Sequence, residues 1–401
     1  MYINKVKKYL FQYVTKEILN QNSKGIIYHN QGHKLITDFL IDLLNSFYQK
    51  YLRVSDDNEI TLRLSSEILQ KKYGRYALYL NYLIDKEYIS NGLPYIAGER
   101  CTEYKLNIKK FESSTFIDYK NYDSSKNKRL LKFYNDPKNF ISHSTIIDKD
   151  ILHHTIDNIN HIAIDYNESI SFLKDVSIDK KKYLKNLDSI KRINHNQIYM
   201  TPDKYGRVHT NFTILKKEIR NKYLFIDGES ISEIDIKNSQ PFFLLKLIAD
   251  NLHLIDNIGS DLQIYFDRVV SGKYYEYFQE KNVFEERDEV KEWVYKLYFG
   301  KPYPNKIFEN IFPTISQFMN SYKKKYGYKE LSHKLQNIES EFIFNRVCRR
   351  LAEKQIIYFT VHDSVNLKES DYIVAKRIFD EEFNNYKVEV KKSILTILNS
   401  N

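Results

Sequence analysis

The strongest constraint on the fold of this chain is a pair of aspartates, each at the end of a short segment with high β propensity. Residues 230–236 predict a buried strand that ends near Asp235, and a polar turn then leads into an apolar helix over 241–250. Residues 355–367 predict two strands joined by a tight turn that contains Asp363. Two carboxylates at strand ends can share a pair of divalent cations for in-line phosphoryl transfer. Because aspartate is also a common turn former, the neighbouring motifs have to decide between these interpretations.

A second pattern lies between the two aspartates, in a segment that predicts one long helix ending before Gly300. Four of its residues are spaced four positions apart and therefore share one helix face: Arg287, Lys291, Tyr295 and Phe299. Two cations and two aromatic rings in line are what the triphosphate and the base of a nucleotide require. A solvated basic stripe beside a core aromatic would have the same spacing. A further helix is predicted over 332–352, with Gln336 in its first turns.

The length and the charge of the chain bound its class. With 401 residues it is long enough for two or three domains, which we expect at 1–110, 111–195 and 196–401. Lys and Arg (62) outnumber Asp and Glu (52), and the net charge of +10 suits a polyanionic partner, although a Lys-rich composition can also reflect the genome. The 34 Tyr and 24 Phe residues include possible stacking surfaces for bases, but most are expected in the core.

Other features of the sequence concern its compartment. Cys101 and Cys348 have no metal-ligand spacing, so a disulfide framework is not expected and a reducing compartment is favoured. The first 20 residues lack the apolar run and the cleavage site of a signal peptide. Nowhere do roughly 18 apolar residues follow one another, so no membrane span is expected. We therefore predict a soluble, cytoplasmic protein with no membrane partner.

The N-terminal region is predicted to be mostly helical and to contain a smaller module. Helical spacing of apolar residues predicts helices over 6–19 and 34–51. The module then follows the order strand, helix, helix and hairpin, at residues 62–64, 66–72, 75–85, 93–96 and 102–106. This order is typical of a winged helix, whose second helix can enter the DNA major groove, but it also occurs in dimerisation and packing modules. The candidate DNA contacts are basic: Lys71, Lys72, Arg75 and Arg100.

The segment after this module predicts a polar linker followed by helices over 151–195. Its basic run, 124–129, is expected to be a solvated surface, with neutralisation of a nucleic-acid backbone as the alternative.

In chain order, five features resemble the family A DNA polymerases and the related single-subunit RNA polymerases of phage and mitochondria. They are the Gly206–Arg207 turn, Asp235 on its strand, the Arg287–Gly300 helix, Gln336 on a helix, and His362–Asp363 in a hairpin. The resemblance covers about residues 200–400 and says nothing about the first 190. It implies an α+β fold with a right-hand polymerase palm and fingers in the C-terminal half. Separately, we expect residues 111–195 to form a linker and a helical, thumb-like region.

The resemblance also implies roles for individual residues. Two Mg²⁺ ions, replaceable by Mn²⁺, would be held by Asp235, Asp363 and the backbone carbonyl of Ile236. The nucleotide would be bound by Arg287, Lys291, Tyr295 and Phe299, and Lys291 would also protonate the leaving pyrophosphate. The primer and template would be contacted by Arg207, Gln336 and His362.

Three departures from the family pattern concern the choice of sugar. Ser364 follows Asp363, as in the RNA polymerases, where the DNA polymerases have Glu. Phe299 stands where both families usually have Tyr, and in the RNA polymerases that hydroxyl helps to select ribose. Gln240 stands where the DNA polymerases have a Glu that excludes the 2′-hydroxyl, and it could do a similar steric job. These departures favour dNTPs on balance.

The implied function is a compact DNA-directed DNA polymerase that extends a DNA primer–template, as in the replication of a phage or a mobile element. The segment between Gly300 and His362 is shorter than usual, and no paired acidic motifs of a proofreading exonuclease precede residue 190. A single-subunit RNA polymerase or primase, which would involve RNA, is one alternative. A catalytically inactive DNA-binding replication or defence factor is another.

Overall fold

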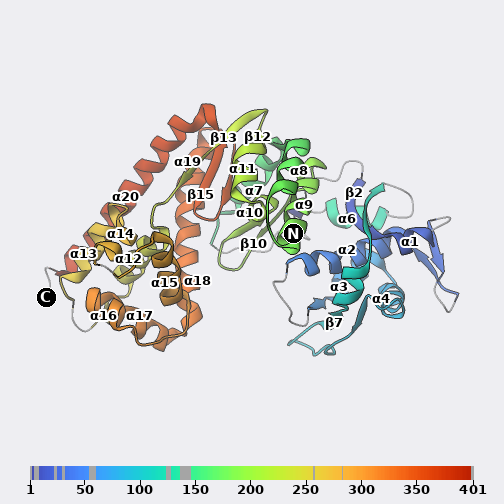
Figure 1. Cartoon of the computed structure of the whole chain (residues 1–401), viewed down its shortest axis with the longest axis horizontal. Helices are drawn as coiled ribbons and strands as arrows, with labels where there is room; N and C mark the ends of the chain where they lie inside the picture. The colour runs from blue at the N-terminus through green and yellow to red at the C-terminus, as the bar shows by residue number, and fades with distance from the viewer. Residues whose placement is uncertain are drawn as a thin grey trace. The chain divides into compact units, whose positions relative to one another are not determined.

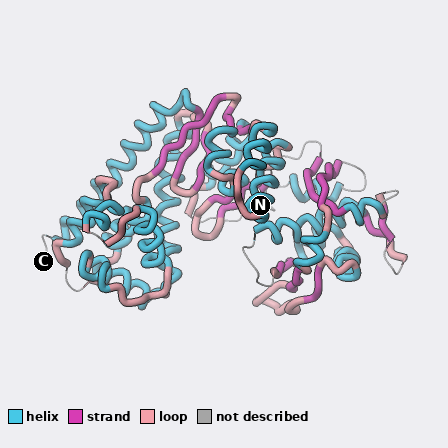
Figure 2. The backbone as a smooth tube through the Cα atoms, viewed as in Figure 1, coloured by secondary structure: helices cyan, strands magenta, loops and turns pink. Residues whose placement is uncertain are grey.

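The computed structural model describes residues 2–3, 9–21, 25–28, 32–53, 60–122, 128–135, 146–255, 258–281 and 283–398. They form a mixed α+β structure in which many helices accompany several small sheets (Figure 2). The chain divides into two compact units. Unit 1 comprises Met1–Ser142, Ala163–Thr201 and Thr210–Tyr223, and unit 2 comprises His143–Ile162, Pro202–His209 and Leu224–Asn401. The segment 111–195, predicted as one region, therefore contributes to both units.

Unit 1 packs around α2 (Thr37–Arg53), in which Leu40, Leu43, Leu44 and Phe47 have no exposed surface. This confirms the predicted helix over 34–51, except that its first three residues form a strand. The remaining elements of unit 1 are β1 (Tyr2–Ile3), β2 (Tyr9–Thr15), α1 (Lys16–Asn20), β3 (Ile26–Tyr28), β4 (Lys34–Ile36), β5 (Thr61–Leu64), α3 (Ser66–Tyr73), α4 (Tyr76–Asp85), β6 (Ile89–Asn91), β7 (Thr102–Leu106), α5 (Ile108–Ser113), β8 (Phe116–Tyr122), α6 (Lys128–Asn135), α8 (Tyr166–Asp175), α9 (Lys180–Asn194), α10 (Asn211–Ile214) and α11 (Lys217–Tyr223).

The helix predicted over 6–19 is wrong for its central part. Residues 9–15 form β2, which pairs antiparallel with β8 from Tyr9↔Tyr122 to Thr15↔Phe116, and residues 4–8 lie outside the described residues. Phe11, Tyr13 and Val14 are aromatic or β-branched and suit a strand once a partner is available. The helical spacing could not reveal a partner that lies about a hundred residues away in the sequence.

The module predicted after residue 60 is present as a strand, two helices and two further strands. Its three strands form an antiparallel sheet in the order β5-β7-β6. The first strand of the predicted hairpin lies earlier than expected, at Ile89–Asn91, and residues 93–96 belong to the loop. Arg129, at the end of the predicted basic run, donates hydrogen bonds to the carbonyls of Gln70 and Lys71 and so caps the C-terminal end of α3. Residues 124–127 of that run lie outside the described residues.

A buried carboxylate joins several elements of unit 1. Asp42 on α2 is fully buried, and its Oδ1 accepts hydrogen bonds from Gln12 Nε2 (2.6 Å) and from the Tyr134 hydroxyl (2.7 Å). Its Oδ2 accepts from the Tyr73 hydroxyl (2.5 Å) and lies 2.8 Å from Nζ of Lys72. Both oxygens are therefore fully used, and the network links β2, α2, α3 and α6.

Unit 2 combines a sheet with a larger set of helices. Figure 1 shows β13 and β15 side by side, with α20 near them. Its elements are α7 (Lys149–Asn158), η2 (Ile159–His161), β12 (Leu224–Ile226), β13 (Glu229–Asp235), α12 (Ser239–Asp250), η3 (Leu252–Leu254), α13 (Asp261–Val270), α14 (Tyr274–Glu280), α15 (Arg287–Phe299), α16 (Lys306–Ile311), α17 (Pro313–Tyr326), α18 (Tyr328–Ser340), η4 (Glu341–Cys348), α19 (Arg349–Glu353), β14 (Tyr358–Val361), β15 (Ser364–Lys368), η5 (Glu369–Asp371) and α20 (Tyr372–Leu398). Three short strands lie where the chain passes between the units: β9 (Ile162–Ile164), β10 (Tyr199–Pro202) and β11 (Val208–Thr210).

The sheet of unit 2 contains the neighbours β14-β15-β13-β12 in this order. The residues of β14 are all buried, which explains the apolar run in its sequence. The helix after β13 is also buried, and from Phe242 to Ile248 only Lys246 keeps notable exposure, so α12 is apolar around most of its circumference. The strand predicted over 230–236, the apolar helix predicted over 241–250 and the hairpin predicted over 355–367 are thus confirmed. The helix predicted over 332–352 comprises parts of α18 and α19 with the π-helical segment η4 between them.

The described residues contain no helix that combines the length and the apolar character needed to cross a membrane.

Candidate functional site

The register of two antiparallel strands brings the two predicted aspartates together. In the pairing of β13 with β15, Asp235 lies directly opposite Ser364, and Asp363 is the residue before that partner. Asp235 is exposed and Asp363 is half-buried, so both carboxylates are accessible. Burial raises the pKa of Tyr295, and the charges of Asp363 and Asp235 raise this pKa further, so both carboxylates lie within electrostatic reach of the same hydroxyl. Residues more than a hundred positions apart thus form one acidic edge of the sheet.

The turn that carries Asp363 has an unusual backbone. Val361 pairs with Ser364, so His362 and Asp363 form a two-residue hairpin turn. His362 has φ 56°, in the left-handed region that glycine usually occupies at this position of a hairpin turn. A non-glycine residue there carries strain, and such strain is often found at functional sites. The strained turn sets the direction in which Asp363 leaves the sheet.

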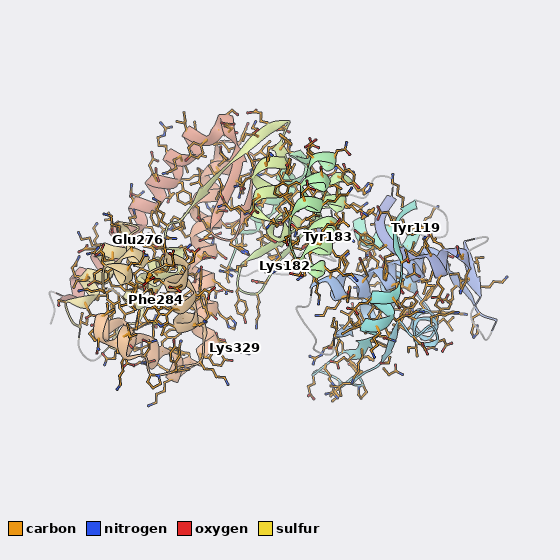
Figure 3. The ribbon with its side chains drawn as sticks, in the orientation of Figure 1. Tyr119, Lys182, Tyr183, Glu276, Phe284 and Lys329 are labelled. Atoms are coloured by element: carbon orange, nitrogen blue, oxygen red, sulfur yellow. The ribbon has the colours of Figure 1, made fainter. Side chains whose placement is uncertain are left out.

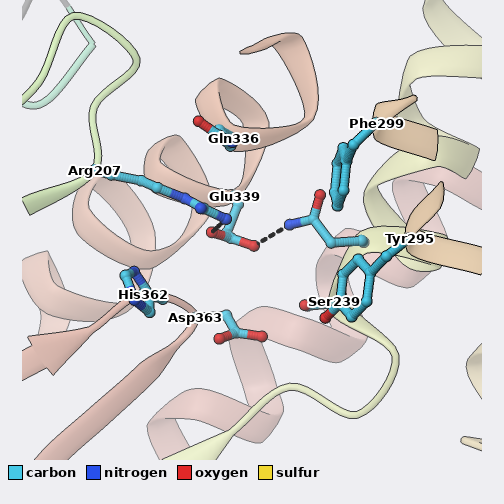
Figure 4. A pocket seen from close by; sticks show the side chains of 9 residues that line it. Arg207, Ser239, Tyr295, Phe299, Gln336, Glu339, His362 and Asp363 are labelled. Atoms are coloured by element: carbon cyan, nitrogen blue, oxygen red, sulfur yellow. Dashed lines mark hydrogen bonds and ion pairs between the residues drawn. The ribbon is translucent and has the colours of Figure 1, made fainter. Parts of the chain in front are cut away.

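A pocket of about 310 Å³ opens beside Asp363 (Figure 4). Its lining comes from five separate stretches of unit 2: Arg207, Ser239 and Gln240, Tyr295 and Phe299, Gln336 and Glu339, and His362 and Asp363. Seven of these nine residues are sequence-predicted site residues, and the structure brings them together. The two additional residues are Ser239 and Glu339.

Glu339 is the site residue that the sequence did not reveal. Its side chain on α18 is almost fully buried, and its two oxygens hold two other pocket residues. Oε1 accepts a hydrogen bond from Arg207 Nη2 at 3.1 Å, and Oε2 accepts one from Nε2 of Gln240 (Figure 4). Burial, and secondarily the charge of Asp363, raise the pKa of Glu339 to about 7, while Arg207 acts in the opposite direction. A buried acid with a shifted pKa that holds two neighbouring side chains beside a pocket is typical of a functional site.

The tight approach of the Arg207 turn to α18 explains its glycine. Gly206 has φ 84°, and a Cβ atom built on it would lie 2.9 Å from Cβ of Ser340. No other residue type fits that space in that backbone conformation, so the turn can bring Arg207 to Glu339 only with glycine at this position.

The helix α15, as predicted, runs from Arg287 to Phe299, but only its C-terminal half lines the pocket. The rings of Tyr295 and Phe299 are stacked with centroids 5.5 Å apart, and the Tyr295 side chain is 45% exposed. Arg287 instead donates to Glu276 (2.8 Å), and Lys291 pairs with Asp288 on its own helix (3.1 Å). Figure 3 labels Glu276 on the helical side of unit 2. In this structure neither cation lines the pocket, although both lie on the face that the sequence predicted.

Metal binding was predicted at Asp235, Asp363 and the carbonyl of Ile236. Within the described ranges, no group of three or more His, Cys, Asp or Glu side chains is arranged to hold a metal ion. Asp235 at the end of β13 and Asp363 in the turn before β15, with the main-chain carbonyl of the buried Ile236, supply hard oxygen ligands of the kind that Mg²⁺ prefers. The donor set therefore fits the predicted ion in its chemistry.

The predicted DNA contacts of unit 1 differ in exposure. Lys71 and Arg75 are exposed at the junction of α3 and α4, and Arg100 donates from Nε to the carbonyl of Pro94 (3.0 Å) in the loop between β6 and β7. The prediction that Lys72 contacts DNA is wrong, because its ammonium is buried against Asp42 and lies over the ring of Tyr134. It serves the core of unit 1 and is not accessible to a phosphate backbone.

No protein-family model matches the chain, and no curated protein matches it.

Proposed function

We propose that unit 2 is a family A-like nucleotidyltransferase that adds nucleotides, in the first place dNTPs, to the 3′-hydroxyl of a primer on a DNA template. The observation that carries the proposal is the pairing of Asp235 with Ser364, which puts Asp235 and Asp363 at one edge of the sheet. Two divalent cations bound there would activate the 3′-hydroxyl and neutralise charge on the reacting phosphate. The α+β organisation of unit 2 agrees with a palm that carries both aspartates and with fingers that carry α15.

The pocket beside the aspartates supports a nucleotide as the ligand. The stacked pair of Tyr295 and Phe299 offers an aromatic surface to a base, and Arg207 offers a cation on the opposite side (Figure 4). Arg287 and Lys291 would bind the triphosphate after exchanging their carboxylate partners for phosphate oxygens, and Lys291 would protonate pyrophosphate. Such an exchange is feasible because both ion pairs are partly exposed and therefore weak.

For unit 1 we propose binding to double-stranded DNA. The succession of α2, β5, α3, α4, β6 and β7, with the sheet order β5-β7-β6, supports a winged helix as the DNA-binding module. The exposed cations Lys71 and Arg75 and the loop residue Arg100 would contact phosphates. Binding by unit 1 and polymerisation by unit 2 together suit a compact replication enzyme of a phage or a mobile element.

Extension of a labelled primer tests the proposal. We expect the wild-type protein to extend it with dNTPs and Mg²⁺, and we expect Asp363→Asn to lower the single-turnover rate by about 10³-fold while the affinity for the primer–template stays within about twofold. Asp380→Asn is the matched control, because Asp380 is an aspartate of unit 2 that pairs with Lys376 on α20. Extension with NTPs alone would favour an RNA polymerase or primase. DNA binding without extension by any nucleotide would contradict the proposed activity.

A further inference from the structure

The wall of the pocket contains two buried polar atoms that have no hydrogen-bond partner. Gln240 is 5% exposed, and while its Nε2 donates to Glu339, its Oε1 has no donor. Arg207 donates from Nη2 to Glu339, but its buried Nε–H has no acceptor. Leaving such atoms unpaired is costly in a folded protein, and each exception calls for an explanation. Both exceptions lie on side chains that line the same pocket and are held by the same carboxylate.

The carboxylate determines which atoms are left for a ligand. Because Glu339 occupies the amide nitrogen of Gln240, the free atom of this amide is an acceptor, and the ligand must supply a donor. Because Glu339 occupies one end of the Arg207 guanidinium, the free Nε–H is a donor, and the ligand must supply an acceptor. The base-stacking surface of Tyr295 and Phe299 lines the same pocket. The ligand group beside that base surface must therefore both donate and accept hydrogen bonds.

We infer that Glu339 is a positioning residue that orients Gln240 and Arg207 to bind the hydroxylated sugar of the nucleotide. The inference rests on the proposed function, because a nucleotide is the ligand that carries such a sugar next to its base. A sugar hydroxyl donates to Oε1 of Gln240, and a sugar oxygen accepts from Nε of Arg207. Gln240 then accepts a hydrogen bond from a sugar hydroxyl, in addition to any steric role. The 2′- and 3′-hydroxyls share this chemistry, and the nucleotides in the test distinguish them.

The test measures equilibrium binding of three labelled nucleotides, ATP, 2′-dATP and 2′,3′-ddATP, to the full-length protein without primer. In the wild type, we expect the nucleotide with the recognised hydroxyl to bind about tenfold more tightly than the one that lacks it. A step between ATP and dATP would assign the 2′-hydroxyl, and a step between dATP and ddATP would assign the 3′-hydroxyl. Equal affinity for all three nucleotides would overturn the inference.

Three variants locate the effect. Gln240→Leu removes the acceptor and should bring the preferred nucleotide to the affinity of the analogue without the hydroxyl, with no change for that analogue. Glu339→Gln should also abolish most of the preference, because its side chain no longer fixes both partners. Glu389→Gln is the control, since Glu389 makes a bidentate pair with Arg346 elsewhere in unit 2. A merely structural role of Glu339 would weaken all three nucleotides equally, and this result would also overturn the inference.

The binding measurement separates this inference from the proposed reaction. Sugar-dependent binding that disappears in Gln240→Leu, combined with no primer extension by the wild type, would support the sugar site and contradict the nucleotidyltransferase. Primer extension by the wild type with no sugar-dependent binding would support the reaction and overturn the sugar site.

Discussion

Asp42 in unit 1 and Glu339 in unit 2 are both buried carboxylates with several partners, but the partners of only one of them are themselves fully hydrogen-bonded. Both oxygens of Asp42 in unit 1 have hydrogen-bond or ion-pair partners, and none of these four partner side chains keeps a buried polar atom without a bond. Glu339 in unit 2 holds two partners, and each of these partners keeps one buried atom unpaired at a pocket. A complete network rigidifies a core, whereas an incomplete one beside a cavity leaves a donor and an acceptor that a bound molecule can use.

Asp42 also distinguishes two lysines that look alike in the sequence. Lys71 and Lys72 are neighbours in a basic stretch, but only Lys71 reaches solvent. Lys72 is neutralised by Asp42 and surrounded by aromatic rings. Whether a lysine belongs to the core or to an accessible surface therefore depends on the residues around it, and not on its position in a basic run.

The largest effect on stability is expected at the complete network. Asp42→Asn leaves the ammonium of Lys72 buried without a counter-charge and should lower the free energy of unfolding by about 3–5 kcal/mol. Chemical denaturation monitored by circular dichroism measures the loss. Asp38→Asn, on the same helix but partly exposed with a bond to Tyr119, should cost less than about 1 kcal/mol. Equal costs for both variants would contradict the distinction drawn for Asp42.

A smaller effect is expected on DNA binding. The double variant Lys71→Gln/Arg75→Gln should weaken binding to double-stranded DNA about tenfold and should reduce the slope of log affinity against log salt by about 2. Lys72→Met should lower stability and leave the salt dependence unchanged, because its ammonium is buried. Titrations of DNA with the folded variants at several salt concentrations measure the affinity and the slope. An unchanged slope in the double variant would remove these residues from the DNA surface.

The smallest effect is a pH dependence at Glu339. Its pKa is raised from 4.5 to about 7 in the folded protein, so between these values the folded state binds more protons than the unfolded state. The contribution of Glu339 is therefore most favourable below pH 4.5 and is lost as the pH rises to about 7. Unfolding curves at pH 5, 6 and 7 should show a steeper loss of stability in the wild type than in Glu339→Gln. Parallel pH profiles would show that Glu339 ionises normally.

Local patterns in the sequence predicted correctly that Asp235 ends a strand, that Asp363 lies in a hairpin turn and that α15 is one continuous helix. Asp235 and Asp363 follow strand-like segments with a turn, and the antiparallel register then brings them together without any further information. The spacing over 287–299 predicted a continuous helix and a shared face, and the helix is confirmed. It did not show that Arg287 and Lys291 have carboxylate partners, because such pairs depend on neighbouring side chains.

The residues that the sequence missed depend on contacts between distant segments. Glu339 was predicted as part of a helix, but its role depends on its contacts with Arg207 and Gln240. These residues lie 132 and 99 positions away from Glu339 in the sequence. The burial of Lys72 requires Asp42 from another helix. β2 required β8 as its partner. A periodic pattern identifies an element and its apolar face, but not the polar group that meets it.

A double-mutant cycle in single-turnover primer extension tests most directly whether Asp235 and Asp363 act as one site. Residues that act as a unit are not additive, so Asp235→Asn, Asp363→Asn and the double variant should each lose about the same factor in rate. Additive losses, or a single variant that keeps the wild-type rate, would contradict the claim that the register of β13 and β15 builds one catalytic centre.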